Sequence, residues 1–368
     1  MNTMRERGER KMRRMKALAH IVGFFFLFTG GYIGGSQVYA KQINVLLVTD
    51  VHRLGDRSYN DFTWDGLLRA SKELKVKINV LEPATEADYE KILRKAAKDA
   101  DVVVLRGTHM QDYLMKVAPR YPKTKFVLIE GEVSQPNVTC YKFKVEEGAF
   151  LAGILLARMS DAGKVGFIGG VPGEETRAFE FGYRAGVITY QEMAGEKLEV
   201  VSSYTGSLED RDKGKTAALE QIKEGIDMIF GAAGGESNDG LIEAMMEQPA
   251  GKDYYAIVLN PHKEWEAMQP IGEHWAIGRV VSSVVRKYDV AAFEGIKSSI
   301  EVKFAPGTYE LGIRENGVDL SEMQYTIEYV PSDVLGFLSR IREEVIAGNI
   351  QVPKNEEEYK EFEPPTLK

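Results

Sequence analysis

The sequence predicts an α/β protein with two lobes, each built on a parallel sheet with helices on both faces. Short apolar runs rich in β-branched residues alternate with amphipathic helical runs along most of the chain. The short runs are apolar almost throughout, as strands buried on both faces require. They fall into two series separated by a predicted helix at Glu146–Ser160, so the chain predicts two lobes of similar construction.

The strands of the two series are predicted from their composition and length. The first series comprises Ile43–Thr49, Lys77–Leu81, Val102–Leu105, Phe126–Glu130 and Val138–Phe143. The second comprises Lys164–Gly169, Leu198–Tyr204, Asp227–Gly231 and Tyr254–Asn260. Between them, apolar residues recur at helical spacing, for example Tyr89, Ile92, Leu93 and Ala96.

The alternation weakens after Asn260. A helix is expected from about Ala276 to Tyr288, followed by short strands near Glu301, Tyr309 and Tyr325. The last helix is expected over Pro331–Ile350, where Asp333 can cap the start and Gly348 can end the helix. The glutamate-rich segment that follows is expected to be a solvated end.

Residues 1–40 have the composition of an export signal. A basic segment precedes an apolar stretch from Ala17 to about Gly35, and Val38-Tyr39-Ala40 offers a cleavage site with small residues. The alternative is an uncleaved membrane anchor, because the apolar stretch is near the length of roughly 20 residues that spans a bilayer. The only cysteine, Cys140, is far from the leader, so cleavage leaves no cysteine to carry a lipid. A soluble periplasmic protein is therefore expected, or a tethered one if the leader stays.

The composition excludes several classes of protein. Without the leader the chain has 40 basic and 53 acidic residues, a net charge of −13. Such an acidic chain is a poor partner for nucleic acid or anionic membranes. One cysteine also excludes an internal disulfide.

Polar side chains gather at the carboxyl ends of the predicted strands, where open α/β sheets bind ligands. The loop "VTDVHRLGDRSYND" after the first strand contributes the largest group. Asp56 or Ser58 could simply cap the next helix. That role leaves Asp50, Tyr59 and Asn60 unexplained. Other residues at strand ends are His52, Arg106, His109, Glu130, Gly169, Gly170, Gly231–Gly235, Asn260 and His262.

No motif for a cofactor, a metal or catalysis is present. The glycine stretches match neither a dinucleotide-binding nor a phosphate-loop pattern. His52, His109 and His262 could meet at a zinc ion, but they belong to different lobes and lack close ligand spacing. No nucleophile motif occurs either. A binding protein is expected rather than an enzyme, although a pair of cleft carboxylates keeps the enzyme alternative open.

The loop "DVHRLGDRSYN" resembles the Asp-x5-Asp-x-Ser-Phe-Asn signature of the basic membrane protein family, the purine-nucleoside-receptor-like lipoproteins of bacteria. Asp50, Asp56, Ser58 and Asn60 match it, and Tyr59 replaces the usual phenylalanine. The stretches "KVEEGAFLAGILLARMS", "GKVGFIGGVPGEETRAFEFGYRAG", "DKGKTAALEQIKEGIDMIFGAAGG" and "IREEVIAGNIQVP" resemble later segments of the family in the same order. The resemblance runs from about Ile43 to Pro353.

The resemblance implies a periplasmic-binding-protein fold of the first type, with two lobes joined by three crossovers. The expected N-terminal lobe is 41–145 plus 278–325, the C-terminal lobe 146–277 plus 326–355, and the flexible tail 356–368. The resemblance also implies capture of a small molecule, commonly a purine nucleoside, for an ABC permease in the inner membrane. A ligand-sensing subunit of a membrane receptor is the alternative.

By resemblance, Asp50, Tyr59 and Asn60 hold the ligand from the first lobe. Phe230, Gly234 and Gly235 are expected to act from the second lobe, although Phe230 could equally be a core residue of its strand. Departures from the family suggest a changed ligand: Asn260 and His262 stand in place of two carboxylates, and Arg286 in place of a lysine. His52 replaces a common glycine, while Arg106 and His109 add polarity. A nucleoside-related metabolite and an acidic small molecule are therefore both candidates.

Overall fold

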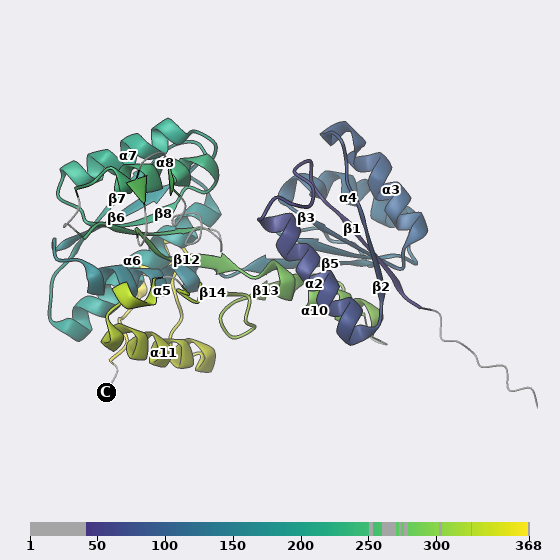
Figure 1. Ribbon diagram of the computed structural model, residues 1–368. Helices are drawn as coiled ribbons and strands as arrows, with labels where there is room; N and C mark the ends of the chain where they lie inside the picture. The colour runs from purple at the N-terminus through teal and green to yellow at the C-terminus, as the bar shows by residue number, and fades with distance from the viewer. Residues whose placement is uncertain are drawn as a thin grey trace, which may run out of the picture. The chain divides into compact units, whose positions relative to one another are not determined.

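The computed structural model describes residues 42–249, 253–259, 270–271, 274–275, 279–301, 304–324 and 326–366. Within them the chain forms two six-stranded sheets, each covered by helices (Figure 1). The predicted α/β class is confirmed. In this part of the chain, every helix is too short or too polar to serve as a membrane span. The predicted leader falls outside the described residues.

The first sheet is parallel throughout, with the order β13-β5-β4-β3-β1-β2. β1 lies between β2 and β3, so the loops that follow β1 and β3 are neighbours. The strands are β1 (Asn44–Val48), β2 (Lys77–Leu81), β3 (Val102–Arg106), β4 (Lys125–Ile129), β5 (Val138–Phe143) and β13 (Gly307–Leu311).

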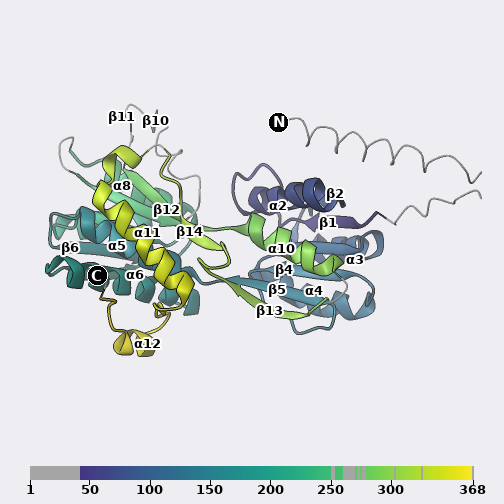
Figure 2. The same ribbon diagram turned by 90° about the horizontal axis from the view of Figure 1, so that it is seen from below.

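Two hydrophobic clusters cover the two faces of this sheet. The helices α3 (Tyr89–Asp99) and α4 (Gln111–Val117) pack on one face. The helices α2 (Tyr59–Leu74) and α10 (Tyr288–Ile300) lie side by side on the other (Figure 2). Cys140 is fully buried in β5, where its Sγ accepts a hydrogen bond from the backbone N–H of Val133 over 3.3 Å.

The second sheet has the order β14-β12-β9-β8-β6-β7, and only its edge strand β14 runs antiparallel. The same rule of burial on both faces explains its apolar strands. They are β6 (Lys164–Gly169), β7 (Glu199–Tyr204), β8 (Met228–Ala232), β9 (Tyr255–Leu259), β12 (Val280–Arg286) and β14 (Val318–Leu320).

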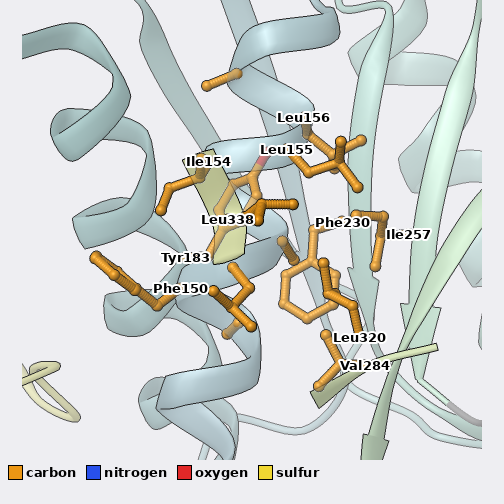
Figure 3. Close-up of a cluster of buried hydrophobic side chains, with 14 of the residues drawn as sticks. Phe150, Ile154, Leu155, Leu156, Tyr183, Phe230, Ile257, Val284, Leu320 and Leu338 are labelled. Carbon is orange, nitrogen blue, oxygen red and sulfur yellow. The ribbon is translucent and has the colours of Figure 1, made fainter. Parts of the chain in front are cut away.

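Close helix packing stabilises the second lobe. A Cβ on Gly186 would lie 2.1 Å from the carbonyl oxygen of Phe150, so a side chain there would collide with the neighbouring helix. The large cluster beneath this contact includes Phe150, Tyr183 and Leu338 (Figure 3). The helices of this lobe are α5 (Val145–Met159), α6 (Glu174–Ala194), α7 (Arg211–Lys223), α8 (Gly235–Met246), α11 (Ser332–Ala347) and α12 (Glu356–Glu361).

Within the described residues the chain passes between the two sheets three times, as the family resemblance implied. The passages run from β5 to α5, from β12 to α10 and from β13 to β14. All nine strands predicted up to Leu259 form within two residues of their expected ends. The helix expected at Glu146–Ser160 is α5, and Gly348 ends α11 with a φ of 82°.

Predictions after Asn260 needed correction. The helix expected from Ala276 to Tyr288 is wrong: Val280–Arg286 is the strand β12, paired with β9. Both β12 and β14 belong to the second sheet, although the range 278–325 was assigned to the N-terminal lobe. Among the three short strands expected, Tyr309 lies in β13, Glu301 follows the end of α10, and Tyr325 is outside the described residues.

Two details of the C-terminal part also differ from expectation. Asp333 does not cap α11: it lies in the first turn and pairs with Arg158 over 2.8 Å. The expected tail contains the helix α12, because the Asn355 side chain caps its first turn by accepting a hydrogen bond from the Glu358 N–H over 2.9 Å.

Candidate functional site

Asp50 lies immediately beyond β1 and is held in one orientation. Its Oδ1 accepts hydrogen bonds from the Asn60 amide over 2.8 Å and from the backbone N–H of His52 over 2.9 Å. Its Oδ2 accepts from the Arg106 guanidinium. Arg106 ends β3, which pairs with β1, so the parallel register itself brings these two charges together. The result is a preorganised carboxylate with a cation beside it.

Asp50 is ionised at neutral pH. Burial acts to raise the pKa of its carboxyl, but Arg106, the Asn60 amide and the His52 N–H together lower that pKa below its usual value. The Nε of Arg106 is buried and has no hydrogen-bond partner in the described part of the chain. One guanidinium donor is therefore left unsatisfied beside the Asp50 carboxylate.

The rest of the loop is shaped by Asp56 and Asp61. Asp56 accepts hydrogen bonds from the N–H groups of Ser58, Asn60 and Asp61 over 2.9, 3.1 and 3.2 Å, so it caps the first turn of α2. Asp61 binds the N–H groups of Gly55 and Arg57 over 2.7 and 2.8 Å. Ser58 makes no side-chain cap. These two carboxylates fix the loop and are engaged before any ligand arrives.

Asn60 is the fully buried centre of the loop. Its amide nitrogen donates to Asp50 over 2.8 Å and to Asp56 over 2.9 Å, and its Oδ1 accepts from the Asp50 N–H over 3.4 Å. One side chain therefore ties the end of β1 to the start of α2. This arrangement explains why the polar residues in the loop occur together.

The Tyr59 ring already has three partners. The guanidinium carbons of Arg106 and Arg286 lie 4.9 and 5.2 Å from its centroid, and the Tyr288 ring lies 4.9 Å away at a tilt of 48°. Guanidinium groups at such distances make cation–π contacts. A flat ligand that stacks on Tyr59 must therefore share the ring with these groups or displace one of them.

Arg286 joins both lobes through its guanidinium. It pairs with Glu130 at the end of β4, and its Nη1 lies 2.9 Å from Glu175 on α6. Its Nη2 donates to the Tyr59 hydroxyl over 2.8 Å. Burial opposes the charge on Arg286, but Glu130 and its other neighbours raise the pKa of the guanidinium well above its usual range. Arg286 is therefore a charged link between the two sheets.

The histidines lie at the edge of this group. The His109 ring is 5.4 Å from the ring of Tyr89, whose hydroxyl accepts a hydrogen bond from the Val51 N–H over 3.2 Å. Partial desolvation and the nearby Arg106 lower the pKa of His109, which favours the neutral ring at pH 7. His52 is exposed. No cluster of three or more metal-ligating side chains occurs in the described ranges.

The expected contacts from the second lobe are only partly in place. Phe230 is fully buried and packs against Tyr183, Phe167 and Phe179 with ring centroids 5.4 to 6.1 Å apart (Figure 3). It belongs to the core because it is an internal residue of β8, so the expectation that it contacts a ligand is not met. Gly234 and Gly235 form the turn into α8 with φ of 77° and 44°. Asn260 and His262 are outside the described residues.

Sequence reasoning did not name Glu175 and Tyr288 as members of this group. Neither carries a local signal: Glu175 is in the first turn of α6, and Tyr288 is the first residue of α10. A cavity of about 370 Å³ shares Glu130 and Glu175 with the Arg286 group. Its wall also includes Thr108 and Gln111, which follow β3. Cavities of this volume are within the range that binds small metabolites.

Comparison with known families identifies the fold and the general role. The family model of PnrA-like ABC transporter substrate-binding proteins matches residues 43–356. The chain belongs to this family. The resemblance seen in the loop around Asp50 is thereby confirmed, and the general role that follows is solute binding for an ABC transporter.

Individual relatives align with this chain over nearly their whole length. An uncharacterized lipoprotein from Pyrococcus abyssi is 28% identical over 95% of this chain and 95% of its own. Basic membrane protein D from Borreliella burgdorferi is 27% identical over 95% and 98%. A solved ABC transporter solute-binding protein from Aeropyrum pernix superposes with a TM-score of 0.67 and 28% identity, covering 87% of this chain and 96% of the other.

Proposed function

We propose that the protein is an exported receptor that captures a neutral ring solute with adjacent hydroxyl groups, such as a purine nucleoside, and delivers it to an ABC permease. The observation that carries the proposal is the Asp50–Arg106 pair, fixed by Asn60 and bordered by the Tyr59 ring. Family membership supplies the general role, and these residues suggest the class of ligand.

A hydroxyl group both donates and accepts a hydrogen bond. The Asp50 carboxylate can accept a hydrogen bond from one hydroxyl of the ligand, while the Arg106 guanidinium donates to the same hydroxyl or to the adjacent one. A carboxylate beside a guanidinium therefore suits a diol. Charge-assisted bonds of this type contribute on the order of 1.5–3 kcal/mol each. The Tyr59 ring supplies an apolar surface beside the pair, as a ribose or a base requires.

An acidic ligand is the weaker candidate because both guanidinium groups already have carboxylate partners. Arg106 is paired with Asp50, and Arg286 with Glu130 and Glu175. To bind either guanidinium, a carboxylate of the ligand must displace a protein carboxylate from it. The displaced group then lies close to the negative charge of the ligand. A neutral solute avoids that cost.

The ligand class is tested by thermal shift and calorimetry with a matched set of compounds. Adenosine, 2′-deoxyadenosine, free adenine and citrate separate the diol, the base and the negative charge. Adenosine is expected to raise the melting temperature progressively with ligand excess. Its deoxy analogue is expected to bind about 10-fold more weakly, since one hydrogen bond to a charged group is lost. Stronger stabilisation by citrate than by any nucleoside would contradict the proposal.

The role in transport is tested separately in cells. Deleting the gene is expected to reduce uptake of the radiolabelled nucleoside found in the binding screen. Complementation with the intact gene is expected to restore uptake. Complementation with an Asp50→Ala variant is expected to fail at low solute concentration. Uptake that is unchanged by the deletion would contradict an importer role while leaving the binding data intact.

A further inference from the structure

Glu146 is a buried acid that makes none of the contacts around Asp50, Tyr59 and Arg286, although it lines the cavity that borders Glu130 and Glu175. It is the second residue of α5, directly after the first passage between the sheets, and the residue is only 9% exposed. Apart from a hydrogen bond from its own backbone N–H, its carboxylate has no hydrogen bond or ion pair with another described residue, although buried charges in proteins are normally paired. It contacts two cavities at once, one of about 770 Å³ and the other of about 370 Å³.

The larger cavity has a strongly acidic wall. It is formed by the start of α5, the end of β13 and the segment from the end of α11 to beyond α12, so residues far apart in sequence enclose it. The wall contains six carboxylates and three basic groups. The carboxylates are Glu146, Glu147, Glu310, Glu358, Glu361 and Glu363, and the basic groups are Lys144, Arg314 and Lys354.

Several of these carboxylates are already engaged. Glu147 accepts a hydrogen bond from the Ile313 N–H over 2.6 Å and lies 3.7 Å from the Lys144 ammonium. Glu358 binds the Lys354 N–H over 3.0 Å. The remaining acids, Glu146, Glu310, Glu361 and Glu363, form no ion pair with a described basic residue. The cavity therefore has more negative charge than its own basic groups neutralise.

We propose that this cavity is a second binding site, which takes a small organic cation with at least two ammonium groups and places one of them against Glu146. A polyamine suits acids that are spread over three segments of chain, because its charges are spaced along a flexible carbon chain. A metal ion requires several ligands at one point, and no such cluster occurs among the described residues. None of Asp50, Tyr59 and Arg106 lines this cavity, so the proposal does not rest on the solute proposed at Asp50.

The protonation of Glu146 offers a direct readout of occupancy. Burial raises the pKa of Glu146 to about 7; Glu147 and Glu310 also raise this pKa, whereas the residue's own backbone N–H and Lys354 lower it. A cation placed beside the carboxylate favours its ionised form. Binding at pH 7 must then release, on average, a fraction of one proton per protein molecule to the buffer.

The test is calorimetric titration of the whole protein with spermidine at pH 7 and physiological salt, in phosphate and in Tris. Saturable binding is expected, with heats that differ between the buffers because their ionisation enthalpies differ. Glu146→Gln is expected to weaken spermidine binding about 10-fold or more and to remove the buffer difference. Glu310→Gln, an exposed change in the same wall, is expected to weaken binding by a smaller factor.

Glu328→Gln is the matched control, because Glu328 is exposed and outside the cavity. It is expected to bind spermidine as the unmodified protein does. The proposal fails if spermidine gives no saturable heat, or if Glu146→Gln binds as tightly as the unmodified protein. It also fails if Glu328→Gln loses as much affinity as Glu146→Gln, since that result indicates general screening of an acidic surface. Titration with adenosine in parallel keeps this outcome separate from that of the Asp50 site.

Discussion

Arg286 donates a hydrogen bond to the hydroxyl of Tyr59 over 2.8 Å, so the last residue of a strand in the second sheet holds the first helix of the first lobe. The same guanidinium binds Glu130 and Glu175. The loop that we propose to grip the solute is thus connected to the second passage between the sheets through one side chain.

Replacing Asn60 by Ala is expected to weaken solute binding by about 10-fold or more, because Asp50 and Asp56 lose the amide that orients them. Calorimetry with the cognate solute measures the effect. Asn79→Ala, an exposed change on β2, serves as the control. Equal affinity for both variants would exclude the loop as the principal contact.

Replacing Arg286 by Gln is expected to destabilise the protein by up to about 3–5 kcal/mol, because Glu130, whose side chain is only 20% exposed, loses its cation. Urea unfolding measures the change. The double variant Arg286→Gln, Glu130→Gln is expected to recover part of the loss. Lys95→Gln removes an exposed pair with Asp99 and is expected to cost at most about 1 kcal/mol. A similar small loss for Arg286→Gln would show that the link contributes little to stability.

Replacing Gly186 by Ala is expected to destabilise the protein by at least about 1–3 kcal/mol, because the added methyl group collides with backbone of α5. Gly336 in α11 provides the opposite case. It is exposed and has open space around its Cα, so Gly336→Ala is expected to stabilise by up to about 1 kcal/mol. Thermal unfolding of both variants checks the pair, and the same sign of effect in both would contradict the packing of α5 against α6.

The pKa of Glu146, raised to about 7, predicts a specific pH dependence. The folded state binds more protons than the unfolded state between the ordinary pKa near 4.5 and about 7, so the stability from this group falls as pH rises through that window. Glu146→Gln removes the dependence. The variant is expected to gain on the order of 2–3 kcal/mol relative to the unmodified protein between pH 5 and pH 8. Unfolding by urea at both pH values measures the gain; parallel stability curves would show that Glu146 titrates normally.

Replacing Phe230 by Ala is expected to cost about 3–5 kcal/mol of stability, since the residue is fully buried among other rings. Its effect on solute affinity is expected to be small once the folded fraction is taken into account. Urea unfolding and calorimetry separate the two. A large loss of affinity with little loss of stability would restore Phe230 as a ligand contact.

Strands buried on both faces were predictable because their composition is distinctive. The prediction of a helix from Ala276 to Tyr288 was wrong because composition and spacing are ambiguous there. Val280, Val281, Val284 and Val285 have a spacing that fits one face of a helix as well as a strand. Only the pairing of β12 with β9 and β14 decides between the two. That pairing depends on residues distant in the chain.

In the candidate site, too, contacts between residues close in sequence were predictable and contacts between distant residues were not. Asp50 and Asn60 are close in sequence, and the loop pattern alone predicts that they act together. The link between Tyr59 and Arg286 joins residues separated by 227 positions, and no local pattern contains it. The resemblance placed Phe230 at the ligand, with the core as the alternative, and the core is where it lies: Phe230 is inside β8, whereas ligand contacts are expected beyond the carboxyl ends of the strands.

The single cysteine gives the protein a built-in reporter of unfolding. Cys140 is fully buried in β5 next to β13, a strand that returns to this sheet from far along the chain. Burial also raises the pKa of the thiol, which suppresses the reactive thiolate. A thiol reagent can therefore label the chain only when the first sheet opens, so the labelling rate reports the opening of that lobe without any engineered probe.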